Sequence, residues 1–392
     1  MRILHVINSL SPADGGPPEA VRQLVHAYRE AGSEAEVACL DNPGEPFLKG
    51  LSCPVHAMDQ RVLGRFAFSP RLWNWLHENA DRFDVLIMNG IWTFPGVAVR
   101  AAARRAKRPY GVFVHGALDP WFNREYPLKH LKKLFYWPVQ HTVLRDAMTV
   151  FFTSKTELEL AKSSFWPNRW NGLIVPYGTV DPEDAGSDPS CQVQEFQRQL
   201  PALDGRRYLL FLGRIHEKKG CDLLLEAFAQ VAADHPEIDL VIAGPDQVGM
   251  QAKLASRSRE LEIAGRVHWP GMIRGDCKWG ALRACDAFIL PSHQENFGIS
   301  VAEALAVGRP VLISNQVNIW REIQEDGVGL VDDDTLEGIV RLLRRWFELT
   351  VAERVAMTAR ARPCFQSRYA MRRTAAIIIA NFASPPLVGR PN

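Results

Sequence analysis

Short apolar runs alternate with amphipathic helical patterns along almost the whole chain, and this alternation limits the possible folds more than any other feature. In the first half, the apolar runs occupy residues 3–7, 36–40, 85–88, 110–114, 150–152 and 173–175. The helical patterns between them occupy residues 18–31, 71–80, 95–106, 128–147 and 155–164. Ser154 and Glu157 have the spacing of a capping box, which supports the start of the last helix. Alternation of this kind is typical of a parallel sheet with helices on both faces, so the sequence predicts an α/β fold.

A second series of the same kind starts at Tyr208. Its apolar runs occupy residues 208–212, 240–243, 267–269, 287–290, 311–314 and 329–331. Because 392 residues exceed what one hydrophobic core usually supports, we predict two domains. The expected divisions are residues 1–179 for the N-terminal domain, 180–206 for a polar linker, 207–365 for the C-terminal domain and 366–392 for a C-terminal helix and tail.

Composition excludes several classes of protein. The formal net charge of +2 argues against a dedicated nucleic-acid binder, for which a clustered basic excess is expected. Seven cysteines without a Cys-x-x-Cys pair indicate neither a zinc site nor a disulfide framework, which suits a reducing cytoplasm. The N-terminus enters a strand directly, and no apolar run approaches the length of a membrane span. We therefore expect a cytoplasmic protein, soluble or peripheral to a membrane.

The segment after the apolar run at 287–290 combines a loop, a helix start and two acidic residues. The helix that follows Gly298 would present unpaired N–H groups and its positive dipole end to an anion. Glu303 lies one turn after Ile299, so its side chain points back toward the loop that carries Glu295. An ionised carboxylate accepts two hydrogen bonds in a fork, which suits a ribose diol or two sugar hydroxyls. A solvated position would explain either Glu alone, but residues 301–306 are otherwise apolar or small, and a buried charge without partners is costly.

A basic loop follows the apolar run at 208–212. Arg214 offers a planar fork of donors and Lys219 a point charge, and together they can neutralise two phosphates. A basic turn after a strand is often only a solvated surface, and we expect this for Lys218.

The arrangement Pro-Ser-x-x-Glu-x-Phe-Gly-x-x-x-x-Glu-Ala at 291–304 resembles the signature of the retaining glycosyltransferases of family 4. The loop at 213–220 is similar to the family's Gly-Arg-x-x-x-x-Lys-Gly loop. The resemblance covers nearly the whole chain and is strongest over 208–315. It implies the GT-B fold, in which two Rossmann-like parallel-sheet domains face one another across a cleft and the C-terminal helix can cross back to the first domain. It also implies retaining, metal-independent transfer of a hexose from a nucleotide-diphosphate sugar, without a further cofactor.

The resemblance assigns roles to individual residues. Glu295 would contact hydroxyls of the donor sugar, Glu303 would hold the ribose diol, and His115 would approach the transferred sugar. Arg214 and Lys219 would clamp the diphosphate and stabilise the charge that grows as the glycosidic oxygen leaves. The catalytic set is therefore expected to be Glu295, His115, Arg214 and Lys219. The donor-binding set is expected to be Gly15, Gly16, Arg214, Lys219, Ile273, Asn296, Phe297, Gly298, Ile299 and Glu303.

Other interpretations of the sequence concern a cofactor, a metal ion and alternative functions. A nicotinamide cofactor is disfavoured, because the loop at 8–18 lacks the Gly-x-Gly-x-x-Gly spacing. Asp332, Asp333 and Asp334 could hold a metal ion weakly, but the run opens a turn and is expected to be solvated, so no metal is predicted. A nonhydrolysing nucleotide-sugar epimerase, a phosphorylase and a non-catalytic GT-B assembly subunit are the alternative functions.

The acceptor is least defined by the sequence. A saccharide or a polyprenyl-linked saccharide is expected, in cell-surface polysaccharide biosynthesis. Residues 121–138 mix basic and aromatic side chains, which suits an anionic membrane surface at the inner face of the plasma membrane. The alternative is an ordinary amphipathic helix whose Leu and Phe side chains face the core.

Overall fold

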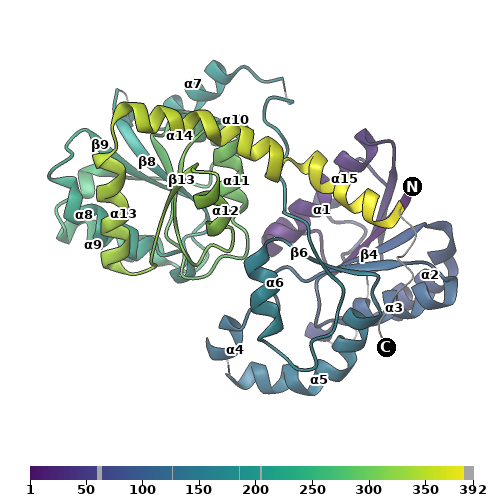
Figure 1. The fold of residues 1–392 in the computed structure, drawn as a ribbon. Helices are drawn as coiled ribbons and strands as arrows, with labels where there is room; N and C mark the ends of the chain where they lie inside the picture. The colour runs from purple at the N-terminus through teal and green to yellow at the C-terminus, as the bar shows by residue number, and fades with distance from the viewer. Residues whose placement is uncertain (60–63, 126, 185, 204, 384–392) are drawn as a thin grey trace. The chain divides into compact units, whose positions relative to one another are not determined.

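The computed structural model describes residues 1–59, 64–125, 127–184, 186–203 and 205–383. The chain divides into two compact units (Figure 1). The first unit comprises Met1–Gly178 and the C-terminal segment that starts at Met371, and the second comprises Thr179–Ala370.

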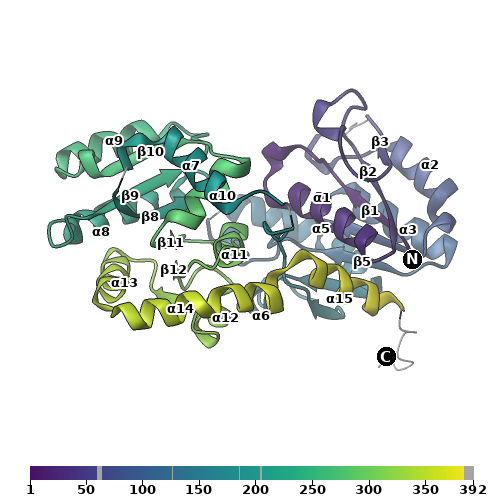
Figure 2. The same ribbon diagram turned by 90° about the horizontal axis from the view of Figure 1, so that it is seen from above.

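The first unit contains a seven-stranded parallel sheet with the order β3-β2-β1-β4-β5-β6-β7. Its strands are β1 (Arg2–Ile7), β2 (Glu34–Cys39), β3 (Val55–Ala57), β4 (Val85–Asn89), β5 (Tyr110–Phe113), β6 (Thr149–Phe152) and β7 (Gly172–Ile174). Its helices are α1 (Gly16–Glu30), α2 (Pro70–Asn79), α3 (Phe94–Ala106), α4 (Trp121–Glu125), α5 (Pro127–Asp146), α6 (Lys155–Lys162) and α15 (Met371–Ala383). Helix α15 lies beside α1, at the other end of the chain (Figures 1 and 2).

The second unit contains a six-stranded parallel sheet with the order β10-β9-β8-β11-β12-β13. Its strands are β8 (Arg207–Leu212), β9 (Ile238–Ala243), β10 (Val267–Gly271), β11 (Ala287–Leu290), β12 (Val311–Ser314) and β13 (Gly329–Asp332). Its helices are α7 (Pro189–Gln199), α8 (Cys221–Ala232), α9 (Met250–Glu260), α10 (Gly275–Ala284), α11 (Ile299–Ala306), α12 (Trp320–Glu325), α13 (Leu336–Glu348) and α14 (Val351–Cys364). The predicted α/β class with two parallel sheets is therefore confirmed.

The central strands are buried on both faces, which explains why their sequences are continuous apolar runs. Every residue of β4, β5, β9, β11 and β12 is buried. In each sheet the strand order reverses beside the first strand, between β1 and β4 and between β8 and β11. Open parallel sheets bind ligands outside the carboxyl ends of the strands at such switch points. Each unit therefore has one position suited to a binding site.

Two parts of the fold differ from the sequence expectation. No apolar run predicts β3, because this edge strand has three residues and all of them are half-exposed. Residues 180–206 are not a linker but part of the second unit, where α7 packs closely against α10. An ideal Cβ on Gly280 would lie 1.9 Å from Gln192 O, so only glycine permits this approach. Gln192 also donates to Asp276 at 3.0 Å and accepts from Arg283 at 2.7 Å. The polar composition of the segment does not reveal these contacts.

The C-terminal helix α15 is tied to the first unit at both ends. The hydroxyl of Thr374 donates to Pro176 O at 2.8 Å, and the amide of Asn381 donates to the Thr149 hydroxyl at 3.0 Å. Phe382 packs edge-on against Phe151, with ring centroids 6.0 Å apart. The tail expected at 384–392 lies outside the described residues.

Candidate functional site

Two loops meet at the carboxyl edge of the second sheet, on either side of the switch point between β8 and β11. The loop after β8 leads through Lys219 to Gly220, which precedes α8, and the loop after β11 leads through Pro291 to α11. Gly220 has a φ of +66°, and an ideal Cβ on it would lie 2.2 Å from Pro291 O. The N–H of His293 donates to Lys218 O at 2.8 Å. The sheet therefore places the two predicted loops in direct contact.

Lys219 and Glu295 form an ion pair between these loops. The Lys219 Nζ lies against Glu295 Oε2, and the side chains are 16% and 18% exposed. The backbone of Glu295 is held at both ends, because its N–H donates to Gln316 O and its C=O accepts from Asn318 N, each at 3.0 Å. The pair presents ammonium donors and carboxylate acceptors in one place, which suits a ligand that carries both phosphate and hydroxyl groups.

Helix α11 starts beside this pair. Gly298 precedes its first residue with a φ of +78°, and an ideal Cβ on Gly298 would lie 3.5 Å from Glu295 Cγ. Among the described residues, no side chain caps the helix. Phe297 is 3% exposed and packs edge-on against Tyr369, so only its backbone can meet a ligand, whereas Asn296 and Ile299 are half-buried. Uncapped N–H groups and the helix dipole make this end of α11 suited to an anion.

Glu303 lies inside α11 and is only 8% exposed. Its Oε1 accepts a charge-assisted hydrogen bond from Lys278 Nζ at 2.7 Å, and Lys278 comes from α10. No sequence pattern connects the two residues, because they are 25 positions apart on different helices. The structure thus supplies the partner that a buried carboxylate requires.

Two of the predicted donor residues stand apart from these pairs. Arg214 follows β8 and is exposed, and it makes no hydrogen bond or ion pair with any described residue. Ile273 follows β10 and is 5% exposed, so its side chain belongs to the core and only its backbone can face a ligand. Arg214 therefore remains available to an anion, while its predicted contact with a diphosphate stays a prediction.

His115 follows β5 at the carboxyl edge of the first sheet in a left-handed conformation, with a φ of +50°. Its ring stacks on Phe113 and on Tyr177, with centroids 5.5 and 5.4 Å away, and its Nδ1 is hydrogen-bonded to the Tyr177 hydroxyl. Burial, reinforced by the nearby His5, lowers the pKa of His115 to about 3. The imidazole is therefore neutral near pH 7 and can exchange hydrogen bonds, but it is a weak base.

Glu157 holds the turn that carries His115. Its buried carboxylate accepts from the N–H of Gly116 at 2.6 Å and from the N–H and hydroxyl of Thr153 at 2.6 and 2.7 Å. Ser154 accepts from the Glu157 N–H as the capping-box spacing predicts, but the returning bond goes to Thr153 and Gly116 instead of Ser154. Three donors compensate the buried charge and fix the loop after β5.

Gly15 and Gly16 lie where the loop after β1 enters α1. Gly15 is the N-cap with a φ of +87°, and the helix begins at Gly16 and not at Pro18. The loop before them is anchored, because Asp41 accepts from the Ser9 hydroxyl at 2.6 Å and from Leu10 N at 2.7 Å. The two glycines therefore sit on a braced loop at the switch point of the first sheet.

The acidic side chains at the end of β13 are paired with other side chains of the protein. Asp332 pairs with Arg341 at 2.6 Å, Asp333 accepts from Asn315 at 2.6 Å, and Asp334 lies 2.9 Å from His293. Within the described ranges, no cluster of three or more His, Cys, Asp or Glu side chains could hold a metal ion.

Comparison with known families decides the classification. Residues 192–363 match the family of glycosyl transferases group 1, and residues 15–178 match the glycosyl transferase 4-like domain. The chain belongs to the group 1 glycosyltransferases. The two matches follow the division into two units. The match over residues 192–363 contains Lys219, Glu295 and Glu303.

Several characterised glycosyltransferases are similar over part of their length. The mannosylfructose-phosphate synthase of Agrobacterium fabrum is 27% identical over 274 residues, which cover 64% of this chain and 59% of that protein. The D-inositol 3-phosphate glycosyltransferase of Geodermatophilus obscurus is 34% identical over 164 residues, which cover 40% of this chain and 35% of that protein. The matched regions therefore span between about a third and three fifths of these relatives' length.

Solved structures of glycosyltransferases share the fold over nearly the whole chain. HepE of Anabaena in complex with UDP is 19% identical, with a TM-score of 0.78 and coverage of 98% of this chain and 100% of that one. Sucrose-phosphate synthase from Thermosynechococcus elongatus is 17% identical, with a TM-score of 0.74 and coverage of 98% of both chains. These likenesses establish the GT-B fold for this glycosyltransferase.

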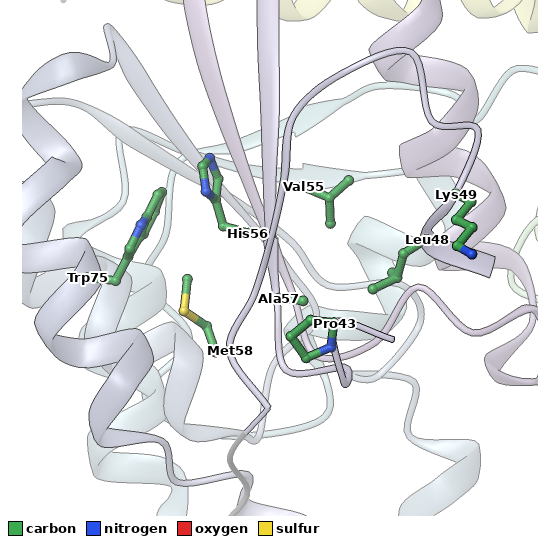
Figure 3. Close-up of a pocket in the computed structure, with 8 residues that line it drawn as sticks. All are labelled: Pro43, Leu48, Lys49, Val55, His56, Ala57, Met58 and Trp75. Carbon is green, nitrogen blue, oxygen red and sulfur yellow. The ribbon is translucent and has the colours of Figure 1, made fainter. Parts of the chain in front are cut away.

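A cavity of about 500 Å³ in the first unit is lined by none of the predicted site residues of this glycosyltransferase (Figure 3). It lies at the edge strand β3 of the first unit, and its lining includes His56 from β3 and Trp75 from α2. These two rings lie 4.4 Å apart between centroids, and His56 also pairs with Glu36 at 2.6 Å. The ring contact and the hydrogen bond between His56 and Glu36 brace the sheet edge.

Proposed function

We propose that this glycosyltransferase moves a hexose from a nucleotide-diphosphate sugar to a hydroxyl of a saccharide or lipid-linked saccharide, with retention at the anomeric carbon. The observation that carries the proposal is the meeting of Lys219, Glu295 and the start of α11 at one switch point. Cationic and helix-end donors suit a diphosphate, and the adjoining carboxylate suits sugar hydroxyls. The UDP bound by HepE supports a nucleotide ligand for a protein of this fold.

The proposed chemistry is electrostatic. Lys219, Arg214 and the N–H groups of α11 stabilise the negative charge that develops on the leaving diphosphate. Because these groups supply positive charge themselves, the transfer is proposed to need no metal ion. Glu295 and His115 orient the sugar by hydrogen bonds, and Glu303 accepts the ribose hydroxyls.

Retention is proposed to follow from attack on the face from which the diphosphate departs. An inverting transfer would need a general base near the acceptor. The pKa of His115, lowered to about 3 by burial, makes this residue unsuited to that task at neutral pH. The departing phosphate oxygen takes the proton of the acceptor hydroxyl in this scheme.

The test is a panel of UDP-, GDP- and ADP-linked hexoses offered with saccharide and sugar-phosphate acceptors, with NMR of each product. We expect one donor to give a product whose anomeric configuration matches the donor, at a rate that a chelator does not change. An inverted product, or turnover lost to the chelator and restored by a divalent ion, would contradict the mechanism. Conversion of the donor sugar without an acceptor would favour an epimerase, and nucleotide-sugar binding without turnover would favour an assembly subunit.

Helix α5 supports a proposal about where the acceptor is met. Trp137, Val143 and Leu144 of this helix are buried in the core, but several large apolar side chains in its first half are exposed instead of facing the core. The exposed fractions are 78% for Leu128, 62% for Leu131, 83% for Phe135 and 46% for Val139, and the spacing places all four on one face of the helix. Lys132 is exposed beside them. No helix in the described part of the chain is long and apolar enough to cross a membrane.

We therefore propose that α5 rests on an anionic membrane surface at the cytoplasmic face, where cell-surface polysaccharides are assembled on lipid-linked acceptors. Apolar rings and aliphatic side chains would enter the interface, and basic side chains would meet anionic head groups.

Replacing Leu131 and Phe135 together by Asp is expected to weaken binding to phosphatidylglycerol vesicles by at least about tenfold, because two apolar side chains that would enter the membrane interface are lost. Vesicle sedimentation measures this. Val351 and Val355 on α14 are 78% and 62% exposed and provide the matched pair for a control. Equal losses from the two double variants, or no binding by the unmodified protein, would contradict the membrane proposal.

A further inference from the structure

Glu303 occupies a position where an isolated negative charge would be costly. Helix α11 is otherwise apolar or small apart from Ser300, and five of its eight residues besides Glu303 are buried. A carboxylate that is 8% exposed in such surroundings needs a cation or several hydrogen-bond donors to offset the cost of its burial. Lys278 is the only described residue whose side chain pairs with it.

The Lys278 ammonium is itself held in place. Its Nζ lies 2.7 Å from Glu303 Oε1 and 4.4 Å from the ring centroid of Trp279, and its side chain is 24% exposed. A cation between a carboxylate and an aromatic face is stabilised by both. The helix that carries Lys278 is in turn locked against α7 by the close approach at Gly280. The cation is therefore part of a rigid support.

Only one oxygen of Glu303 is used by this support. Lys278 contacts Oε1, and within the described residues Oε2 accepts no hydrogen bond. A carboxylate oriented through one oxygen keeps its second oxygen, and a lone pair on the first, for two further donors. Two adjacent hydroxyl groups supply two donors at this spacing.

We propose that Lys278 is a positioning residue that orients the Glu303 carboxylate so that it selects a nucleotide with an intact ribose diol. The proposal rests on the proposed function, in which Glu303 accepts the ribose hydroxyls. Lys278 acts through Glu303. Its contribution therefore appears in the discrimination between ribose and deoxyribose, and a lysine with only a structural role would not change that discrimination.

The test uses equilibrium binding and needs no acceptor. UDP, GDP and ADP are titrated into the full-length protein by calorimetry, and the tightest of them is compared with its 2′-deoxy form. The unmodified protein is expected to bind the deoxy form about tenfold more weakly, or about 1.4 kcal/mol. In Lys278→Met, we expect the ribonucleotide to bind about fivefold to tenfold more weakly. The ratio of the dissociation constant of the deoxy form to that of the ribonucleotide is expected to fall below about two. Lys278→Arg, which keeps the charge, is expected to retain most of the ratio.

Lys253→Met provides the control, because Lys253 is an exposed lysine of the same unit on α9. The ratio of the two dissociation constants in Lys253→Met should match that of the unmodified protein. A preference for ribose that survives in Lys278→Met would overturn the role of Lys278 and leave the proposed function intact. An unmodified protein that binds a nucleotide without preferring ribose would instead overturn the diol contact of Glu303, and with it the role of Lys278. Tighter ribonucleotide binding by Lys278→Met would show that Lys278 blocks Glu303, which also overturns the proposal.

Discussion

Replacing Lys219 by Met is expected to lower the turnover number for sugar transfer by about 10²–10³-fold, with a smaller change in the KM for the donor. The Lys219 ammonium lies against Glu295, at the start of α11. Negative charge on the diphosphate grows as the glycosidic bond breaks, so the loss of this cation raises the energy of the transition state more than that of the bound donor. Met keeps most of the length of the side chain. Initial rates over a range of donor concentrations measure the effect.

Two further variants separate the possible causes of this loss. Lys218→Met alters the neighbouring lysine, and its turnover is expected to stay within about twofold, since Lys218 is not assigned to the diphosphate. In Lys219→Met the partly buried Glu295 loses its ion partner, which could disturb the loop by itself. The double variant Lys219→Met with Glu295→Gln removes that imbalance. Recovery of turnover in the double variant, or an equal loss in Lys218→Met, would contradict a direct role for Lys219.

Replacing Gly220 by Ala is expected to lower the free energy of unfolding by about 2–5 kcal/mol, because backbone strain and steric overlap add. The φ of +66° disfavours any side chain, and the new Cβ would lie 2.2 Å from Pro291 O. The overlap forces apart the two loops that carry Lys219 and Glu295. Donor affinity should therefore fall together with stability. Thermal unfolding and nucleotide titration measure the two effects.

Gly308→Ala gives a matched comparison in the same unit. Gly308 has a φ of +76°, but an ideal Cβ on it meets nothing within 4 Å. This variant carries the strain without the overlap and should cost about 1–2 kcal/mol, with donor affinity unchanged. If the two variants lost the same stability and both bound donor normally, the contact between the loops at Gly220 would not be important.

The strands whose burial is complete are predicted most directly. Runs such as Ala287–Leu290 and Val311–Ser314 have the bounds that the apolar pattern indicates. The edge strand Val55–Ala57 could not be found in this way, because its three residues are half-exposed and show no periodic apolar pattern. The segment at 180–206 shows the converse limit. Its polar residues indicate a solvated linker, but Gln192 is 1% exposed and its side chain is hydrogen-bonded to α10.

For the candidate site, the residues within one loop could be predicted from their spacing. The side-chain partners that come from different loops could not. Glu295 and Glu303 stand out because seven residues separate them around a glycine that opens a helix. Lys278 and Tyr177 have no such signal, since each meets its partner only after the chain has folded. The exposed apolar face of α5 also could not be assigned from its sequence, because a helical period does not state which side the core lies on.

By itself, the sequence determined the α/β class, the order of the buried strands, and the two loops with a glycine and a charge at fixed spacing. These features depend on local backbone preference and on burial, which act over a few residues. Only the tertiary structure decided which charges pair, which lysine supports which carboxylate, and which apolar face is left in water. Those outcomes depend on parallel strands that bring distant segments to one sheet edge. A contact between distant segments produces no periodic pattern in the sequence.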